Sequence, residues 1–166
     1  MMQSSQPLSP EAATQTVIEF IANVPLFDSM EQNELEVAAR HMKLIPFSDG
    51  DILFREWEKG DYACFIVDGT LDVMKRCDGD RYKTVTSLER GKSIGELSIV
   101  ENFPRLVTLK ARTRGWVVTF SREDFESLLK AYTEIGIKIL KGIIGLLGHN
   151  LRKTSSRLSD YMMPMS

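Results

Sequence analysis

The sequence predicts a mainly β domain flanked by helices, with helical segments at the N-terminus and one long helix at the C-terminus. Three observations predict it. Residues 42–120 hold short segments rich in β-branched and aromatic residues, separated by glycine-containing turns. Helix-capping patterns precede this region, and a long stretch with helical apolar spacing follows it. Many short strands at such spacing favour a barrel, a sandwich or a jelly roll.

The N-terminal helices are predicted from their capping residues. Ser9-Pro10-Glu11 supplies a cap, a first-turn proline and a first-turn acid ahead of the apolar pattern in AATQTVIEFIANV. Ser29 and Gln32 have the spacing of a capping box, which predicts a second helix over NELEVAARHM. We assign residues 1–23 to an N-terminal arm and helix.

The strands of the middle region are predicted from runs of β-branched and aromatic residues. These runs are DILF, ACFIV, TLDVMK, YKTVTSL, LVTLKA and WVVTF. The turn signals among them are Asp49-Gly50, Gly60-Asp61, Asp68-Gly69, Asp78-Gly79 and Arg90-Gly91. This alternation of runs and turns predicts antiparallel strands over most of the region.

Two helices are predicted after the strands. Ser121 and Asp124 form a start similar to a capping box for REDFESLLKAY. A long helix follows from about Thr133 to Asp160, and it contains Gly136, Gly142, Gly145 and Gly148. Because an interior glycine costs about 1 kcal/mol relative to alanine, this helix needs packing partners.

The long helix carries two apolar stripes. One stripe has the alternating steps of three and four that are typical of a coiled-coil seam, and comprises Ile137, Leu140, Ile144, Leu147, Leu151, Thr154, Leu158 and Tyr161. The second, beside it, comprises Ile139, Ile143 and Leu146. One helix half-buried on its own domain needs a single stripe. We therefore expect one stripe to cover the domain and the other, through Ile137, Leu140, Ile144, Leu147, Leu151 and Leu158, to form a homodimer.

Composition indicates an ordinary soluble protein. Apolar residues make up 43% and charged residues 27% of 166 residues, with a net charge of −2. This charge disfavours a dedicated nucleic-acid binder, and the few residues after Tyr161 cannot form a recognition helix, so no DNA binding is expected. The first ten residues lack the features of a signal peptide, and the most apolar run, residues 135–148, is too short to span a membrane. A cytoplasmic location with free Cys64 and Cys77 is therefore expected.

The sequence offers little support for catalysis. His41 and His149 lie on helical stretches without a serine or cysteine nucleophile in a known motif. The histidine-rich strand motif of a metal-dependent β-roll is absent from the sequence, and neither cysteine has metal-ligand spacing. We expect a protein that is not an enzyme and that has no metal and no cofactor.

Three segments carry a resemblance to a known family. They are FREWEKGDYACFIVDGTLDV (54–73), GELSIVENFPRLVT (95–108) and NLRKTSSRL (150–158). Together they resemble the cyclic nucleotide-binding domain of bacterial catabolite activators and of the regulatory subunits of cAMP-dependent kinases. The resemblance implies a double-stranded β-helix, that is, a jelly-roll-like β-roll, over residues 24–132. It also implies a dimerisation helix and tail over residues 133–166.

The second segment resembles the phosphate-binding cassette of that family, and the implied ligand is cAMP or cGMP. Glu96 can accept a hydrogen bond from the ribose hydroxyl, and the planar fork of Arg105 suits the phosphate. Gly95 permits close approach, and a short helix can present backbone N–H groups near Leu97 and Ser98. The third segment implies that Thr154 and Ser155 meet the base. An alternative from spacing alone is a Glu96–Arg105 salt bridge that closes a surface loop.

The sequence departs from the family pattern after the arginine. Leu106 and Val107 stand where small residues are usual, although both positions belong to the implied site. Trp57 stands where a turn glycine is usual. The leading interpretation is a sensor module that binds a cyclic nucleotide and signals through its C-terminal helix to an unknown protein partner in trans. The alternative is a degenerate β-roll that binds no nucleotide and serves as a dimerisation or interaction scaffold.

Overall fold

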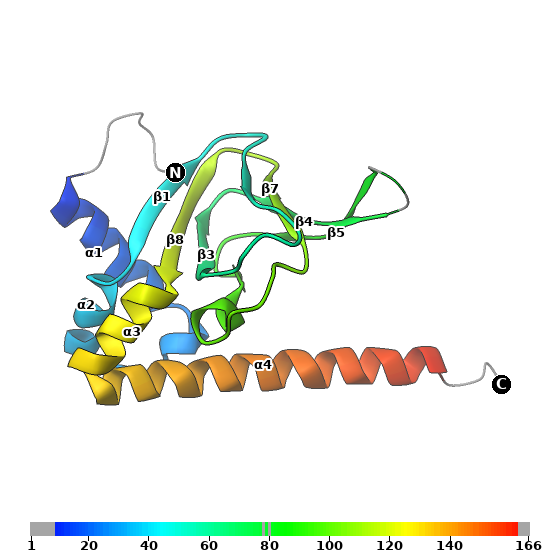
Figure 1. Ribbon diagram of the computed structural model, residues 1–166. Helices are drawn as coiled ribbons and strands as arrows, with labels where there is room; N and C mark the ends of the chain where they lie inside the picture. Colours follow the sequence, from blue (N-terminus) through cyan, green and yellow to red (C-terminus); the bar gives the residue numbers. More distant parts are fainter. Residues whose placement is uncertain (1–8, 78, 80, 163–166) are drawn as a thin grey trace.

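Two four-stranded antiparallel sheets form the centre of the molecule (Figure 1). The structure is a computed structural model and describes residues 9–77, 79 and 81–162. The first sheet has the order β1-β8-β3-β6 and comprises Lys43–Phe47, Gly115–Ser121, Tyr62–Asp68 and Ser93–Ile94. The second has the order β2-β7-β4-β5 and comprises Ile52–Phe54, Thr108–Ala111, Leu71–Arg76 and Tyr82–Leu88. This arrangement confirms the predicted β-roll.

The two faces of the first sheet bury different cores. Strand β3 alternates, because successive side chains of a strand point to opposite faces. Cys64 and Ile66 lie in the core between the sheets, whereas Ala63, Phe65 and Val67 pack against the helices. Since both faces of β3 are covered over residues 63–67, all five of these residues are apolar, which explains the uninterrupted run ACFIV.

The strand prediction missed β1 and β6. Strand β1 is an edge strand that pairs with β8, and it contains Pro46, which cannot donate a ladder hydrogen bond. Strand β6 has two residues, too few to show a pattern. The predicted Asp78-Gly79 turn lies partly outside the described residues, as do residues 1–8 of the predicted arm and 163–166 of the predicted tail.

The N-terminal helices are α1 (Pro10–Ile21), the 3₁₀ turn η1 (Pro25–Phe27) and α2 (Gln32–Ala39). Ser9 caps α1 as predicted, since its hydroxyl accepts a hydrogen bond from the N–H of Ala12. The predicted capping box of Ser29 and Gln32 is wrong. Glu31 is the cap of α2, and the Glu34 carboxylate accepts from the N–H of Glu31 at 2.8 Å. The helix therefore begins two residues later than the spacing suggested, with Glu31 and Glu34 forming the capping box.

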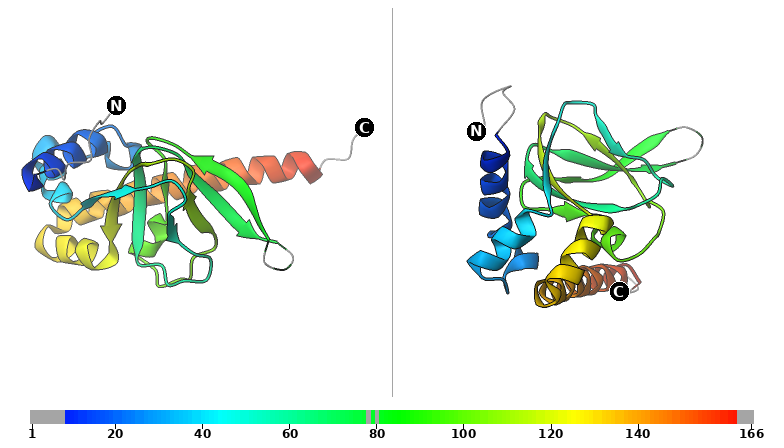
Figure 2. Two further views of the ribbon diagram at one scale, coloured as in Figure 1. Left: turned by 90° about the horizontal axis from the view of Figure 1, so that it is seen from above. Right: turned by 60° about the vertical axis from the view of Figure 1, so that its left-hand side comes forward.

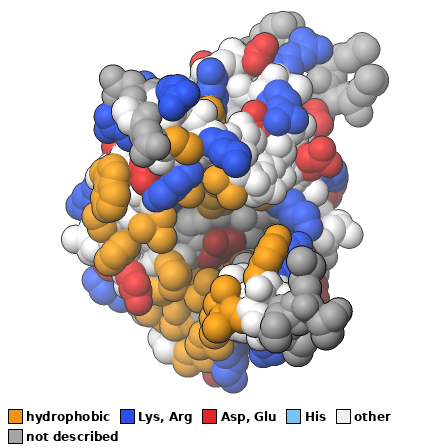
Figure 3. Space-filling view, turned by 90° about the vertical axis from the view of Figure 1, so that its right-hand side faces the viewer, with side chains coloured by type: hydrophobic (Ala, Val, Ile, Leu, Met, Phe, Trp, Pro, Cys, Tyr) orange, Lys and Arg blue, Asp and Glu red, His pale blue; other side chains and the backbone are white. Residues whose placement is uncertain are grey.

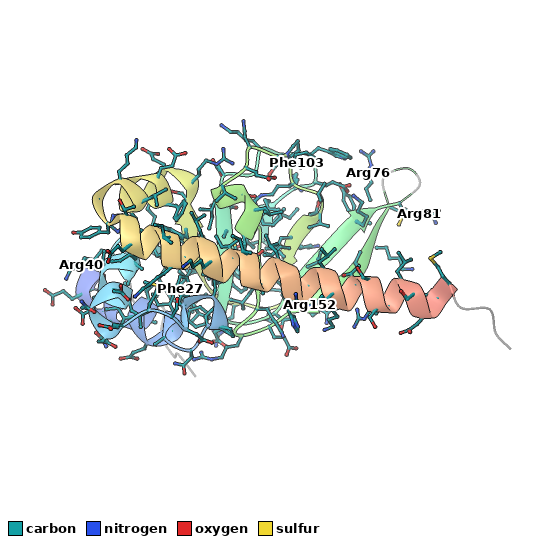
Figure 4. The ribbon with its side chains drawn as sticks, turned by 90° about the horizontal axis from the view of Figure 1, so that it is seen from below. Phe27, Arg40, Arg76, Arg81, Phe103 and Arg152 are labelled. Atoms are coloured by element: carbon teal, nitrogen blue, oxygen red, sulfur yellow. The ribbon has the colours of Figure 1, made fainter. Side chains whose placement is uncertain are left out.

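Helices α3 (Arg122–Ala131) and α4 (Thr133–Met162) follow β8. Ser121 caps α3 as predicted, through a hydrogen bond from the N–H of Asp124 at 3.0 Å. Helix α4 runs along the roll and continues past it, as Figure 2 and the view from below in Figure 4 show, with Arg152 on the outer half. No helix within the described residues is both long enough and apolar enough to cross a membrane.

The first half of α4 is held by close packing. A Cβ added to Gly142 would lie 2.0 Å from the carbonyl oxygen of Leu26 in η1, so glycine is what permits the two backbones to touch. The Lys138 ammonium also bonds both carboxylate oxygens of Glu34 at 2.7 and 2.8 Å, which ties α4 to the start of α2. The sequence predicted that this glycine-rich helix needs packing partners. In the structure, these partners are η1, α2 and α3.

The two stripes of α4 face different surroundings. Ile139 and Ile143 are buried against the domain, as expected for the second stripe. In the predicted seam, Leu140 and Leu147 also pack partly against that core. Four exposed apolar members recur every seven residues: Ile137, Ile144, Leu151 and Leu158. Thr154 and Tyr161 of the seam are exposed as well. The predicted homodimer stays a prediction. The predicted domain boundary at residue 133 also stays a prediction, and buried residues of the first half of α4 belong to the same hydrophobic core as those of α1.

Candidate ligand-binding site

The site begins at the turn between β6 and the 3₁₀ helix η2 (Glu96–Ile99). Gly95 has a φ of +82°, in the left-handed region that side chains rarely adopt. A Cβ built at Gly95 would lie 2.4 Å from Nη1 of Arg105. Glycine is therefore needed here both for the turn and for the approach of the arginine.

Arg105 is buried, and no carboxylate of the described residues forms an ion pair with it. Its side chain is 4% exposed, and its guanidinium carbon lies 4.0 Å from the ring centre of Phe54 and 4.6 Å from that of Tyr62. Nη1 donates to Ser98 Oγ at 3.1 Å and Nη2 donates to the carbonyl oxygen of Tyr62 at 2.7 Å. Nε is buried and has no hydrogen-bond partner.

The alternative in which Glu96 neutralises Arg105 does not hold. Within the described residues, no ion pair of 4.0 Å or less joins Glu96 to Arg105. Removing a charge from water without a partner costs several kcal/mol or more. A buried guanidinium with a free Nε therefore has the chemistry of a site for an anion.

A cavity of about 220 Å³ opens beside this arginine. The predicted cassette residues that line it are Gly95, Glu96, Leu97, Ser98, Arg105, Leu106 and Val107. The remaining lining residues are not among the predicted site residues, and they are Phe54, Ile94, Glu101, Phe103, Pro104 and Leu147. On the side of the molecule toward which α4 extends, Figure 3 shows a recess rimmed by hydrophobic side chains with an acidic side chain inside it.

Thr154 and Ser155 do not line this cavity. Both are exposed on the outer half of α4, about two turns beyond Leu147. Their implied contact with a base remains a prediction. Leu147 is the residue of α4 that lines the cavity in the described part of the chain.

The two departures after Arg105 have different surroundings. The Leu106 side chain is 57% exposed, while Val107 packs partly against the core of the roll. The carbonyl oxygen of Leu106 accepts from Lys75 Nζ at 2.8 Å. In the part of the chain that the structure describes, the N–H of Leu106 has no protein acceptor, so it remains free to donate to an anion beside Arg105.

Trp57 has a left-handed backbone conformation, which favours glycine. Its φ is +72°, which is unusual for a bulky residue, and its side chain is 68% exposed. The N–H of Trp57 donates to the carbonyl oxygen of Arg105, and the N–H of Arg105 donates to that of Glu58, each at 2.8 Å. These bonds hold the backbone of Arg105 on both sides.

Sequence reasoning missed Arg122, the first residue of α3. Its Nη2 donates to the carbonyl oxygens of Ser98 at 2.8 Å, Gly60 at 2.9 Å and Glu101, and its Nε donates to Ser98 at 3.1 Å. Arg122 therefore fastens η2 to α3. No local pattern could have indicated this role, because the carbonyl groups come from two distant segments.

Two ionisable side chains close to Arg105, Cys64 and Tyr62, stay neutral near pH 7. Burial raises the pKa of the Cys64 thiol to about 12 and that of Tyr62 to about 12. Neither can supply a negative charge to Arg105. In the described residues, no group of three or more histidine, cysteine or acidic side chains is arranged to hold a metal ion.

A comparison with known protein families shows to which family this chain belongs. A family profile described as "Cyclic nucleotide-binding domain" matches residues 44–132, which is more than half of the chain. The chain belongs to this family. The resemblance stated from the cassette is thereby confirmed, and the buried arginine lies within the matched segment.

Relatives of the cyclic nucleotide-binding domain include regulators and kinases. The chain is 30% identical over 69% of its length to a cGMP-dependent protein kinase of Plasmodium berghei. It is 25% identical over 86% of its length to a CRP-like cAMP-activated global transcriptional regulator of Mycobacterium tuberculosis. The chain spans 13% of that kinase and 62% of that regulator.

A solved cyclic nucleotide-binding domain from Methylobacillus flagellatus has the same fold. Its TM-score with this chain is 0.77 at 22% identity, and the match covers 92% of this chain and 85% of that one. At this identity the likeness supports the fold alone.

Proposed function

We propose that this chain binds a cyclic nucleotide, cAMP or cGMP, in the cavity beside Arg105 and acts as a regulatory module. One observation carries the proposal: a buried guanidinium with an unpaired Nε and no carboxylate within 4.0 Å, in the described residues, lines a cavity. A cyclic phosphate supplies the missing negative charge. Charge-assisted hydrogen bonds to it contribute about 1.5–3 kcal/mol each.

The other groups of the cavity suit the rest of such a ligand. Glu96 is half-buried in the cavity wall and accepts a hydrogen bond from the ribose hydroxyl. The N–H of Leu106 offers a donor to the phosphate beside Arg105. The apolar residues of the remaining wall, which include Leu97 and Phe103, receive the base, and Glu101 also lines the cavity.

Helix α4 carries the signal in this proposal. Leu147 lines the cavity, so a bound nucleotide touches the helix directly, while η2 is tied to α3 through Arg122. A change in the position of α4 is then read by a protein partner in trans. The exposed residues at seven-residue spacing join two copies of the chain along the same helix.

Calorimetric titration of the purified chain with cAMP and with cGMP tests the proposal. Saturable binding of either nucleotide supports it, and the ratio of the two affinities identifies the preferred base. Absence of heat with both, at millimolar nucleotide and at two temperatures, contradicts it.

The second candidate function is a β-roll that binds no nucleotide and serves as an interaction scaffold. Leu106 and Val107 favour it, because both add bulk at the cavity wall. Leu106→Ser discriminates between the two candidates. The side chain is mostly exposed, so we expect the melting temperature to be unchanged and nucleotide binding to tighten. If Leu106→Ser still binds neither nucleotide, the scaffold is favoured.

Leu151→Glu is expected to separate the homodimer. Leu151 is 68% exposed and lies away from the cavity. Leu147 lines the cavity, so its replacement could change both dimerisation and nucleotide binding. A glutamate placed in an apolar seam loses its water without gaining a partner. Sedimentation should show a monomer, and Ser156→Glu, on the same helix but off the seam, should remain a dimer. A Leu151→Glu protein that sediments as a dimer contradicts the predicted seam.

A further inference from the structure

A second cavity, of about 470 Å³, lies at the open end of the roll. It is formed by the inner face of β1, β8 and β3, strands that lie side by side in Figure 1, together with β2 and the start of α3. The register of β3 and β8 places Cys64 opposite Thr119 and Tyr62 opposite Ser121 on this face. It is larger than the cavity beside Arg105, and the proposed nucleotide site does not use it.

The floor of the second cavity is apolar and uncharged. It consists of Ile45, Leu53, Tyr62, Cys64 and Val117. Cys64 and Val117 are fully buried, whereas Ile45 is 42% exposed. The Tyr62 hydroxyl donates to the carbonyl oxygen of Leu53 at 2.8 Å, so the floor has no free hydroxyl at that point.

The rim of the second cavity carries a net negative charge. Its charged residues are Lys43, Asp61 and Asp124. Lys43 and Asp124 form an ion pair at 4.0 Å, and Asp124 also accepts from the Ser121 hydroxyl at 2.5 Å. In the described part of the chain, no cation lies within 4.0 Å of the Asp61 carboxylate. An apolar floor with one uncompensated acid at the rim is complementary to a monocation with an apolar body.

We propose that the second cavity binds a small organic monocation, an amine with an apolar or aromatic body, and that Tyr62 links its occupancy to Arg105. The ammonium group pairs with Asp61, and the apolar body covers Ile45 and Val117. This site is distinct from the nucleotide cavity, since the two have no lining residue in common.

Tyr62 lines the second cavity and contacts Arg105 of the first. Its ring lines the second cavity, and that ring lies 4.6 Å from the guanidinium carbon of Arg105. Its carbonyl oxygen accepts the 2.7 Å hydrogen bond from Nη2 of Arg105. A molecule packed against the ring of Tyr62 therefore changes the surroundings of the buried guanidinium, and by linkage any ligand of Arg105 changes the affinity of the second cavity.

NMR titration of the full chain with phenethylamine tests the proposal, with phenylacetate and phenethyl alcohol as probes of equal size and different charge. We expect saturable shifts at the amides of Cys64, Val117 and Thr119 and at the Nε–Hε group of Arg105 with the amine. The alcohol should bind more weakly, and the acid should not bind. Because no nucleotide is present, the outcome is independent of the proposed nucleotide binding.

Two variants and a control complete the test. Asp61→Asn should weaken phenethylamine about fivefold, the upper end for an exposed ion pair, whereas Asp28→Asn, with the same loss of charge away from the cavity, should not. Ile45→Trp, which fills the cavity from its exposed edge, should abolish the shifts, and it decides the matter if Asp61→Asn fails to fold. Equal binding of amine and acid, or unchanged binding in Ile45→Trp, overturns the site. Amine binding without a shift at Arg105 overturns the link.

Discussion

Arg105→Ala is expected to weaken nucleotide binding at least tenfold, equivalent to about 1.4 kcal/mol or more. The change removes the buried positive charge that faces the cavity and leaves a phosphate there without its main donor. Arg105→Lys should recover only part of the affinity, because an ammonium cannot reproduce the planar fork or its stacking on Phe54. Calorimetric titration with the preferred nucleotide measures both variants.

The matched control for this prediction is Arg114→Ala. Arg114 is exposed, lies away from the cavity, and has the same charge. Its replacement should leave nucleotide affinity unchanged. Since Arg105 also bonds Ser98 and the backbone of Tyr62, a thermal melt must accompany each titration. A folded Arg105→Ala protein with the affinity of the unaltered chain would show that Arg105 does not hold the phosphate.

Gly142→Ala is expected to destabilise the fold by about 1–3 kcal/mol, the usual cost of overpacking. The added methyl group would lie 2.0 Å from the carbonyl oxygen of Leu26, and backbone atoms cannot move aside as a flexible side chain can. Helix α4 must therefore shift away from η1, which weakens the packing of Ile139 and Ile143. Urea unfolding of both proteins measures the difference.

Gly145→Ala provides a control of opposite sign on the same helix. A Cβ at Gly145 meets nothing within 4 Å, so only the helix propensity changes. Alanine should then stabilise the protein by about 1 kcal/mol. If both alanines shift the unfolding midpoint in the same direction, close packing of Gly142 on η1 is not what holds α4.

The sequence by itself determined the fold class and most of the cassette. Strand β3 is recognisable because both of its faces are buried, and α1 and α3 begin at Ser9 and Ser121 as their caps predict. These features are local, since a cap or a turn is satisfied within three or four residues. The cassette is recognisable for a similar reason, because Gly95, Glu96 and Arg105 lie within one short segment.

Only the tertiary structure decided the features that depend on distant partners. The anchoring of η2 by Arg122 depends on carbonyl groups from residues 60, 98 and 101. The same holds for the seam of α4. Sequence spacing groups Leu147 with Leu151, but packing against the roll places Leu147 at the cavity and leaves Leu151 in solvent. Periodicity specifies which residues share a helix face, whereas burial also depends on where the neighbouring elements end.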